Sequence, residues 1–281
     1  MGPVNSEPDI ELLPNVNGKF ACVTLDLEND WYLEEPGYDH LTFEYIDQYI
    51  DLVTDLDLPI SVFVVGKTLE SHPNDVKTIQ KRINSEFHLH SFSHDLTKSY
   101  DFSNEIEHGI ASFKSFFGHR PQGYRAPQGN ITSEEVRYLD KAGFEFDSSV
   151  FPSYRPGVYN NLAAPIRPYR PPGTNQLIEY PIGTVPKIRV PLSQSYLKLL
   201  GRPYLWALKR LPLPDVLVFD SHLQDFFRTA SHGQLSTPIR QIHERNLSNS
   251  IGLFRDLVRI LRDRGYEFTT LSTIHNREGV T

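Results

Sequence analysis

The sequence contains very little cysteine. Cys22 is the single cysteine among 281 residues, so no disulfide can form within the chain. Zinc clusters built on several thiolates are excluded for the same reason. Any metal bound by this chain would therefore need histidine and carboxylate ligands.

Long apolar runs and an excess of basic residues are also missing. No stretch approaches the roughly 18 apolar residues of a membrane-spanning helix. Residues 1–18 are polar, contain proline and lack the apolar core of a signal peptide. The net charge of −7 argues against a protein that follows nucleic-acid phosphates. These absences predict a cytoplasmic protein with no transmembrane segment and no nucleic-acid partner; membrane-surface association and the oligomeric state stay open.

What is present is an apolar content of 39 %, enough for a globular core, and an alternation of strand and helix patterns. Strands are predicted at 20–25, 60–65, 123–125, 144–146, 216–219 and 266–271, with a further strand ending at His90. Helices are predicted at 41–56, 67–84, 103–117 and 132–142, followed by a long helix ending at Arg264. This alternation predicts parallel strands with crossover helices, in an α/β barrel or a doubly wound sheet.

Residues 152–191 interrupt the alternation with many prolines and few periodic signals. A helix over 195–211 follows them. We predict that residues 152–215 form an insertion that lies as a cap over the barrel rim, with aromatic residues that either stack on a bound ligand or form a small core of their own. The predicted division is an N-terminal extension at 1–18 and a single barrel domain at 19–281.

Polar side chains that can act as acids, bases or metal ligands follow several of the predicted strands. Asp26, His90, Arg125, Asp147 and His222 all stand at or just after a strand's carboxyl end. In an α/β barrel these ends meet at one rim, where the active site is built. The sequence therefore predicts one site that collects these five residues.

Histidines and carboxylates in this set suggest a metal site. His90 and His94 are four residues apart, and on a helical turn this spacing puts both imidazoles on one face. Two histidines with one carboxylate form a common catalytic zinc set. Asp26, Glu28 and Asp30 follow the first strand, and hydrolysis at a metal needs one carboxylate as base and another as ligand. The alternative is an acidic loop that only caps or solvates.

Arg125 and His222 suggest acid–base chemistry. Arg125 precedes Ala126-Pro127 and is held extended, so its guanidinium can hold a carboxylate ionised and oriented. His222 can act as general acid to a leaving amine, and Asp147 could hydrogen-bond that imidazole and raise its pKa. Each of these residues also has an alternative interpretation without a catalytic role. Arg125 could be a surface arginine, His222 a buried structural histidine and Asp147 an aspartate that caps a turn. Tyr124 and Pro127, beside Arg125, are predicted to contact substrate.

Taken in order, five segments resemble the five motifs of polysaccharide deacetylases, the chitin-deacetylase-like (NodB homology) superfamily. The segments are Thr24-Leu-Asp26, His90-Ser-Phe-Ser-His94, Arg125-Ala-Pro127, Asp147-Ser-Ser149 and Phe219-Asp-Ser-His222. The resemblance runs from about residue 19 to 275. It is strongest to the subgroup with an Asp-x-Glu first motif that is associated with exopolysaccharide synthesis.

This resemblance implies a distorted (β/α) barrel of seven or so strands and a divalent metal, zinc first, with cobalt or manganese as alternatives. It also implies that Asp26 is the catalytic base, oriented by Arg125, that His90 and His94 are ligands, and that His222 is the general acid.

One departure concerns the third ligand. Many family members have two adjacent aspartates, whereas Leu27 follows Asp26 here. The third ligand is then Glu28 or Asp30. Glu28 is favoured because alternate residues of a strand share a face.

The resemblance implies a metal-dependent hydrolase that removes an N-acetyl group from an amino sugar in a polysaccharide, an oligosaccharide or a glycan precursor. One alternative is a metal-dependent hydrolase of another non-peptide C–N bond, in a cyclic amide or a formamide. The other is a catalytically silent carbohydrate-binding barrel. The expected partner is an N-acetylated sugar substrate.

Overall fold

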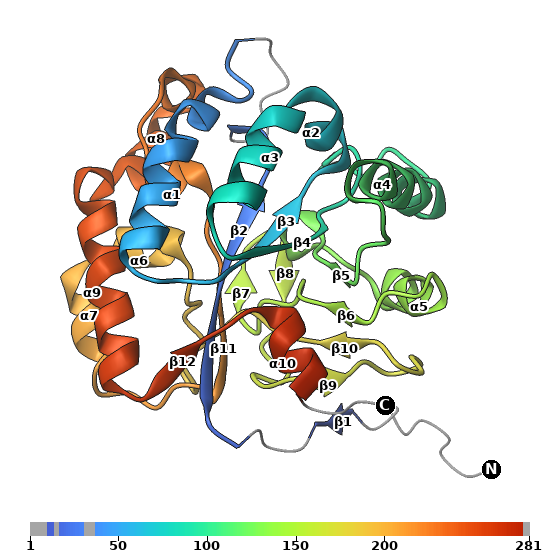
Figure 1. The fold of residues 1–281 in the computed structure, drawn as a ribbon. Coiled ribbons are helices and arrows are strands. Elements are labelled where there is room, and N and C mark those ends of the chain that lie inside the picture. Colours follow the sequence, from blue (N-terminus) through green and yellow to red (C-terminus); the bar gives the residue numbers. More distant parts are fainter. Residues whose placement is uncertain (1–9, 14–16, 31–36, 278–281) are drawn as a thin grey trace.

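A curled, mainly parallel sheet forms the centre of the molecule (Figure 1). The computed structural model describes residues 10–13, 17–30 and 37–277. Its parallel strands are β2 (Lys19–Leu27), β3 (Ile60–Val64), β4 (Ser85–Leu89), β5 (Gly123–Tyr124), β6 (Phe146–Asp147), β10 (Ile178–Glu179), β11 (Val216–Phe219) and β12 (Tyr266–Phe268). From β2 the order runs through β3, β4, β5 and β6 to β10, while β11 pairs with the other edge of β2.

An isolated parallel bridge between Ile182 and Val218 links the segment after β10 to β11, so the two ends of the curled sheet approach each other. The prediction of a distorted (β/α) barrel is confirmed.

Helices pack on the outside of the sheet (Figure 1). They are α1 (Ile46–Asp55), α2 (Gly66–Ser71), α3 (Pro73–Arg82), α4 (Phe102–Phe117), α5 (Ser133–Lys141), α9 (Ser250–Asp263) and α10 (Leu271–Arg277). A capping box of Thr132 and Glu135 stands at the start of α5, where the backbone N–H groups of the first turn need partners. β2 is buried from Phe20 to Leu27, as expected for a strand covered on both faces.

Several predicted helices are shorter than the sequence pattern suggested. The helix expected over 67–84 is two helices, because Pro73 begins a new one after His72. The prediction of one long helix that ends at Arg264 is also wrong. The segment contains α8 (Thr237–Glu244), then a 3₁₀ turn, then α9. Asn246, which lies between α8 and the 3₁₀ turn, adopts a left-handed φ of 54°. The strand expected over 266–271 ends at Phe268.

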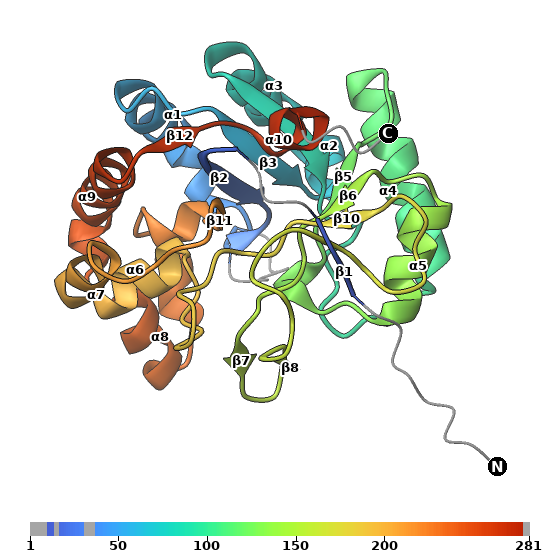
Figure 2. The ribbon, with the colours of Figure 1, turned by 90° about the horizontal axis from the view of Figure 1, so that it is seen from below.

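The predicted cap region divides between the barrel and its rim. β10 lies within the main sheet, and β9 (Tyr169–Arg170) joins it antiparallel and pairs in turn with β1 (Glu11–Leu12). The hairpin of β7 (Tyr154–Arg155) and β8 (Tyr159–Asn160) projects away from the barrel (Figure 2). Helices α6 (Gln194–Leu200) and α7 (Arg202–Leu208) replace the single predicted helix, since Gly201 has a positive φ of 63°.

None of the helices in the described ranges has the length and apolar character that a bilayer crossing requires.

Candidate metal and catalytic site

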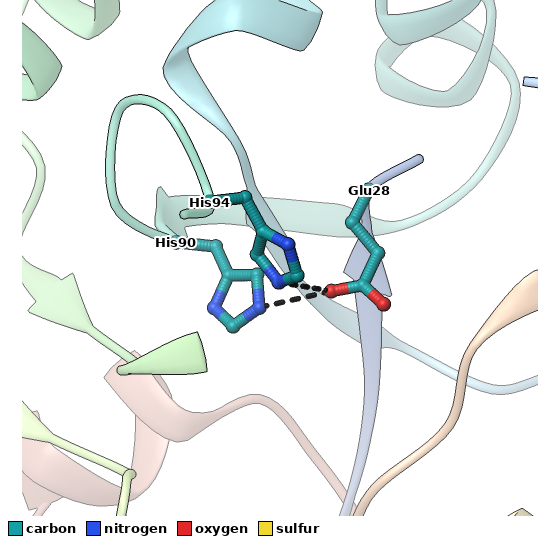
Figure 3. A group of neighbouring side chains, drawn as sticks. All are labelled: Glu28, His90 and His94. Atoms are coloured by element: carbon teal, nitrogen blue, oxygen red, sulfur yellow. Dashed lines mark hydrogen bonds and ion pairs between the residues drawn. The ribbon is translucent and has the colours of Figure 1, made fainter. Parts of the chain in front are cut away.

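One carboxylate and two imidazoles meet at the carboxyl end of the sheet (Figure 3). Glu28 directly follows β2, His90 directly follows β4, and His94 lies further along the loop that begins at His90. Glu28 Oε2 is 2.7 Å from His94 Nε2 and 3.2 Å from His90 Nε2. All three side chains are buried. The sequence prediction that brought both histidines together with Glu28 therefore describes a real cluster.

The two histidines do not lie on a helical turn, so that part of the prediction is wrong. Residues 90–94 form a loop in which Ser91 and His94 have positive φ values of 59° and 58°. Glu105, in the first turn of α4, fixes this loop by accepting hydrogen bonds from Phe92 N, at 2.9 Å, and from Ser93 N and Oγ. The geometry of the pair is thus set by a remote carboxylate instead of by helical periodicity.

Glu105→Ala is expected to weaken metal binding about 10- to 100-fold, because residues that orient metal ligands contribute to affinity on this scale. Competition with a coloured chelator measures the affinity, and circular dichroism checks that the variant folds. Glu107→Ala, on an exposed position of the same helix, is the matched control. Unchanged affinity in a folded Glu105→Ala protein would show that the loop does not depend on this carboxylate.

The donor set fits a divalent cation. His90 Nδ1 donates to the backbone oxygen of Arg125 at 2.9 Å, which leaves Nε2 directed at Glu28. Burial alone would raise the pKa of Glu28. The charges of His94 and His222, together with hydrogen bonds from His90 and His94, outweigh burial and hold this pKa well below its usual range. An ionised carboxylate beside two imidazole nitrogens is the composition of many catalytic zinc sites.

Asp30, the rival for the third ligand position, is engaged elsewhere. Its fully buried carboxylate accepts hydrogen bonds from Thr42 N, at 3.2 Å, and from Thr42 Oγ1. Burial raises the pKa of Asp30 above its ordinary value. Among the described residues, the cluster with possible metal ligands at this position contains Glu28 and not Asp30.

Asp26 lies beside this cluster and is held by Arg125. Arg125 Nη1 donates to Asp26 Oδ1 at 2.6 Å and to Thr24 Oγ1 at 2.7 Å, and Nε donates to Ser148 O at 2.9 Å. The guanidinium is 1 % exposed and lies 4.0 Å from the ring centroid of Phe63. Such a fully engaged arginine has one orientation, so the position of Asp26 Oδ1 is fixed. The predicted contact between Arg125 and Asp26 is present.

His222 faces the same two carboxylates from β11's side of the barrel. Its Nε2 is 3.8 Å from Asp26 Oδ2 and 3.7 Å from Glu28 Oε1. Its Nδ1 donates to Asp225 Oδ2 at 3.3 Å. Burial lowers the pKa of His222, but the negative charges of Asp220, Glu28 and Asp225 outweigh it and raise the pKa well above its usual value. A protonated imidazole that points at the cluster can donate a proton there.

Asp225 is itself anchored from α6. Lys198 Nζ lies 3.1 Å from Asp225 Oδ1, and Ser195 Oγ donates to the same carboxylate at 2.7 Å. Both Lys198 and Asp225 are almost completely buried. The pKa of Asp225 stays below its ordinary value because Lys198 and His222 outweigh the effect of burial. Asp225 therefore remains ionised and keeps His222 oriented.

Asp147 was predicted to hydrogen-bond the imidazole of His222, and it does not. Among the described residues, the carboxylate that accepts a hydrogen bond from His222 Nδ1 is that of Asp225. Asp147 accepts a hydrogen bond from Ser149 Oγ and stands in register with Glu179 of the neighbouring strand β10. Burial raises the pKa of Asp147 to about 6, and burial together with Asp147 raises that of Glu179 well above its usual value. The two carboxyl groups form a buried pair within the barrel wall.

Tyr124 and Pro127 were predicted to contact substrate, and neither lines the cavity at the site. Tyr124 is 1 % exposed and packs edge-on against Phe102 and Phe144 in the core. Pro127 is buried and begins the short 3₁₀ turn Pro127–Gly129. Strand alternation explains the error for Tyr124, because its neighbour Arg125 is the residue that faces the site.

The site opens into a cavity of about 380 Å³. Asp26, Glu28, Arg125, Asp220 and His222 form its polar wall. Phe151, the β7–β8 hairpin, α6 and α8 also line the cavity. The apolar residues that they contribute are Phe151, Tyr159, Tyr196, Leu199, Ile239 and Ile242, and the polar ones include Arg155, Ser195, Lys198 and His243.

A second group of possible ligands is made of Asp26, Asp220 and His222. Arg125 Nη1 lies 2.6 Å from Asp26 and 3.3 Å from Asp220, so both carboxylates already face a permanent positive charge. Burial raises the pKa of Asp220 to about 6. A cation is therefore better accommodated by the cluster of Glu28 with the two histidines.

Sequence reasoning missed Glu105, Asp225 and Lys198. Asp225 stands three residues after His222, a spacing at which two side chains of one helical turn meet, so this partner could have been found. Glu105 and Lys198 have no local signal, since each reaches the site only through the packing of its helix.

Comparisons with known proteins agree with this fold. Residues 36–146 match the family model for polysaccharide deacetylase. The peptidoglycan deacetylase-like protein FGM2 of Gibberella zeae is 28 % identical over 94 residues. These residues are 32 % of this chain and only 28 % of that protein, so the shared part is less than a third of the relative's length.

Solved structures are similar over nearly the whole chain. A Mycobacterium smegmatis protein classed as a polysaccharide deacetylase has a TM-score of 0.63 at 16 % identity, with 95 % of this chain and 93 % of that chain covered. PuuE allantoinase has a TM-score of 0.63 at 14 % identity, covering 94 % and 91 %. BA3943 of Bacillus anthracis, a CE4 family pseudoenzyme, has a TM-score of 0.54 at 13 % identity, covering 92 % and 66 %.

At such identities the solved structures show a shared fold alone, and the family match lies within that fold. The predicted resemblance to polysaccharide deacetylases is confirmed by the match over residues 36–146, while the subgroup stays a prediction. Less than half of this chain is similar to the polysaccharide deacetylase family model, and nearly the whole chain shares the fold of a solved structure classed in that family.

Proposed function

We propose that this protein is a metal-dependent hydrolase that removes an N-acetyl group from an amino sugar, in a polysaccharide, an oligosaccharide or a glycan precursor. The observation that carries the proposal is the meeting of three parts at the carboxyl end of the sheet, beside a cavity that Asp26, Glu28, Arg125 and His222 line. Glu28, His90 and His94 form a ligand set, Arg125 holds Asp26 beside it, and His222 faces both. The cytoplasmic location stays a prediction from the sequence.

A divalent metal, zinc first and cobalt or manganese otherwise, held by Glu28, His90 and His94 would supply a Lewis acid for the acetamide carbonyl and make water more acidic. Asp26 takes the proton of the attacking water. Its Oδ1 is occupied by Arg125, so Oδ2, which lies 3.7 Å from His90 Nε2, is the oxygen left to accept that proton. Arg125 keeps this carboxylate in place during the attack.

His222 completes the reaction by donating the proton on Nε2 to the departing amine nitrogen. The C–N bond breaks, and acetate and the free amino sugar leave. Asp225 accepts the hydrogen bond from Nδ1, which fixes the ring orientation and leaves Nε2 as the nitrogen that faces the reaction.

Asp225→Asn is expected to reduce kcat roughly 10- to 100-fold at alkaline pH, a fraction of what a general acid contributes. The Asp225 carboxylate raises the pKa of His222, so its loss lowers that pKa and His222 loses its proton at a lower pH. The alkaline limb of the kcat profile therefore moves toward lower pH, as measured by acetate release.

Asp215 is exposed, so Asp215→Asn is the matched control. Thermal unfolding checks that the Asp225 variant is not destabilised by leaving the buried ammonium group of Lys198 without its carboxylate partner. An alkaline limb in the same place as in the wild-type protein would contradict the role given to Asp225.

Acetate release in the presence of zinc, cobalt or manganese tests the proposed function directly. The substrates are acetylated chito-oligosaccharides, a peptidoglycan fragment and a monosaccharide glycoside. We expect release from at least one of them, with loss of activity in His94→Ala. Absence of release from all of them by a folded, metal-loaded protein would refute deacetylation.

A second candidate is hydrolysis of a cyclic amide. The similarity to PuuE allantoinase, with the same TM-score of 0.63 as the Mycobacterium smegmatis protein, favours testing it. Allantoin, a hydantoin and a formamide in the same metal-supplemented assay separate the two reactions. A folded protein that binds sugars but retains no metal and hydrolyses none of these amides would instead be a catalytically silent barrel. The family of related folds contains such a case, since BA3943 is described as a pseudoenzyme.

A further inference from the structure

Helix α8 presents two large aliphatic side chains to the cavity. None of its residues is buried, and Ile239 and Ile242 are 48 % and 51 % exposed. They are three residues apart and lie on one helix face, and both line the cavity that contains Asp26 and His222. Aliphatic groups left open beside reacting groups point to a ligand that covers them.

The apolar surface continues from α8 onto neighbouring segments. Tyr196 and Leu199 of α6 line the same cavity, as do Phe151 and Tyr159, whose rings stack at 5.7 Å with an angle of 18°. We call these four residues with Ile239 and Ile242 the apolar wall. The cavity, at about 380 Å³, has room for much more than an acetyl group.

The apolar wall lies on the side of the site where the amine leaves. Helix α6, which carries Tyr196 and Leu199, also supplies Ser195 and Lys198 to Asp225, and Asp225 holds His222. His222 is the group that would protonate the amine nitrogen. The fragment attached to that nitrogen therefore extends toward α6 and α8.

We propose that the amine fragment of the substrate carries an apolar group, an alkyl chain or an aromatic ring, which the apolar wall receives. This inference rests on the proposed function, because it uses His222 to define the leaving side. It narrows the substrate class to an amino sugar with an apolar aglycone. Burial of that group against six apolar side chains contributes binding in proportion to the area removed from water.

The test compares the methyl, phenyl and octyl β-glycosides of N-acetylglucosamine, with the octyl compound below its micelle concentration. Dissociation constants are measured by calorimetry on the metal-loaded Asp26→Asn variant, and kcat/KM by acetate release from the wild-type protein. We expect octyl to bind at least about tenfold more tightly than methyl, in line with the burial of several methylenes. Preference for phenyl over octyl would identify the group as aromatic.

In Ile239→Ser/Ile242→Ser the octyl-to-methyl ratio is expected to fall toward one. Gln241→Ser, exposed on the same helix and absent from the cavity lining, keeps the wild-type ratio. Equal binding of the methyl, phenyl and octyl glycosides overturns the apolar subsite even if all are deacetylated. Selective octyl binding without hydrolysis supports the subsite and refutes the proposed function instead.

A protein dimer that buries Ile239 and Ile242, detected as a concentration-dependent mass that the double serine variant abolishes, would also overturn the inference, because a second copy would then cover the wall.

Discussion

Asp26→Asn is expected to lower kcat about 10³-fold, or about 4 kcal/mol of transition-state stabilisation, while metal content stays unchanged. Asparagine keeps the size of the side chain but cannot accept the proton of the attacking water. Glu28→Gln is expected to remove the activity and most of the metal, because a ligand carboxylate is replaced by a neutral amide between two imidazoles. Acetate release and elemental analysis after dialysis measure the two effects separately.

Asp30→Asn is the control that decides between the two carboxylates proposed for the metal. Asp30 is held by Thr42 and lies outside the ligand cluster, so this variant is expected to keep its metal even if it is less stable. A folded Asp30→Asn protein without metal, beside a metal-loaded Glu28→Gln protein, would reverse the assignment.

The position of the site could be predicted from the sequence because barrel geometry is simple. Asp26, His90, Arg125 and His222 follow apolar strands, and the carboxyl ends of parallel strands meet at one rim. No knowledge of loop conformation is needed for that step. The same argument placed Glu28 with the histidines, since strand alternation extends one residue beyond β2.

The conformation of residues 90–94 could not be predicted from the histidine spacing. A spacing of four fits a helical turn, but the loop is built from the left-handed residues Ser91 and His94 and from three hydrogen bonds to Glu105. Glu105 comes to the loop only when α4 packs against the sheet. Local periodicity carries no information about such a contact.

The misassignment of Asp147 follows from a strand that the sequence pattern hides. β10 is two residues long and lies in a proline-rich region, so neither length nor alternation identifies it. Its Glu179 stands in register with Asp147 and pairs with it. Without β10 the carboxyl group of Asp147 lacked a visible partner, and His222 was the nearest chemically suitable choice.

His222→Asn is expected to lower the rate of amide hydrolysis about 10²- to 10⁴-fold, the range that general acid catalysis contributes. An amine is a poor leaving group and needs a proton as the C–N bond breaks, and His222 Nε2 faces the reacting carboxylates at 3.7 and 3.8 Å. An activated ester such as 4-nitrophenyl acetate needs no such proton. Its hydrolysis by the variant is therefore expected to stay within about threefold of the wild-type rate.

The comparison of amide with ester separates a general acid from a residue that merely shapes the cavity. Asp26→Asn, which removes the base, is expected to impair both substrates, because both need an activated water. If His222→Asn slowed the ester as strongly as the amide, with metal content and folding unchanged, His222 would act before the C–N bond breaks. The base would then have to be assigned jointly to His222 and Asp26, whose side chains already lie 3.8 Å apart.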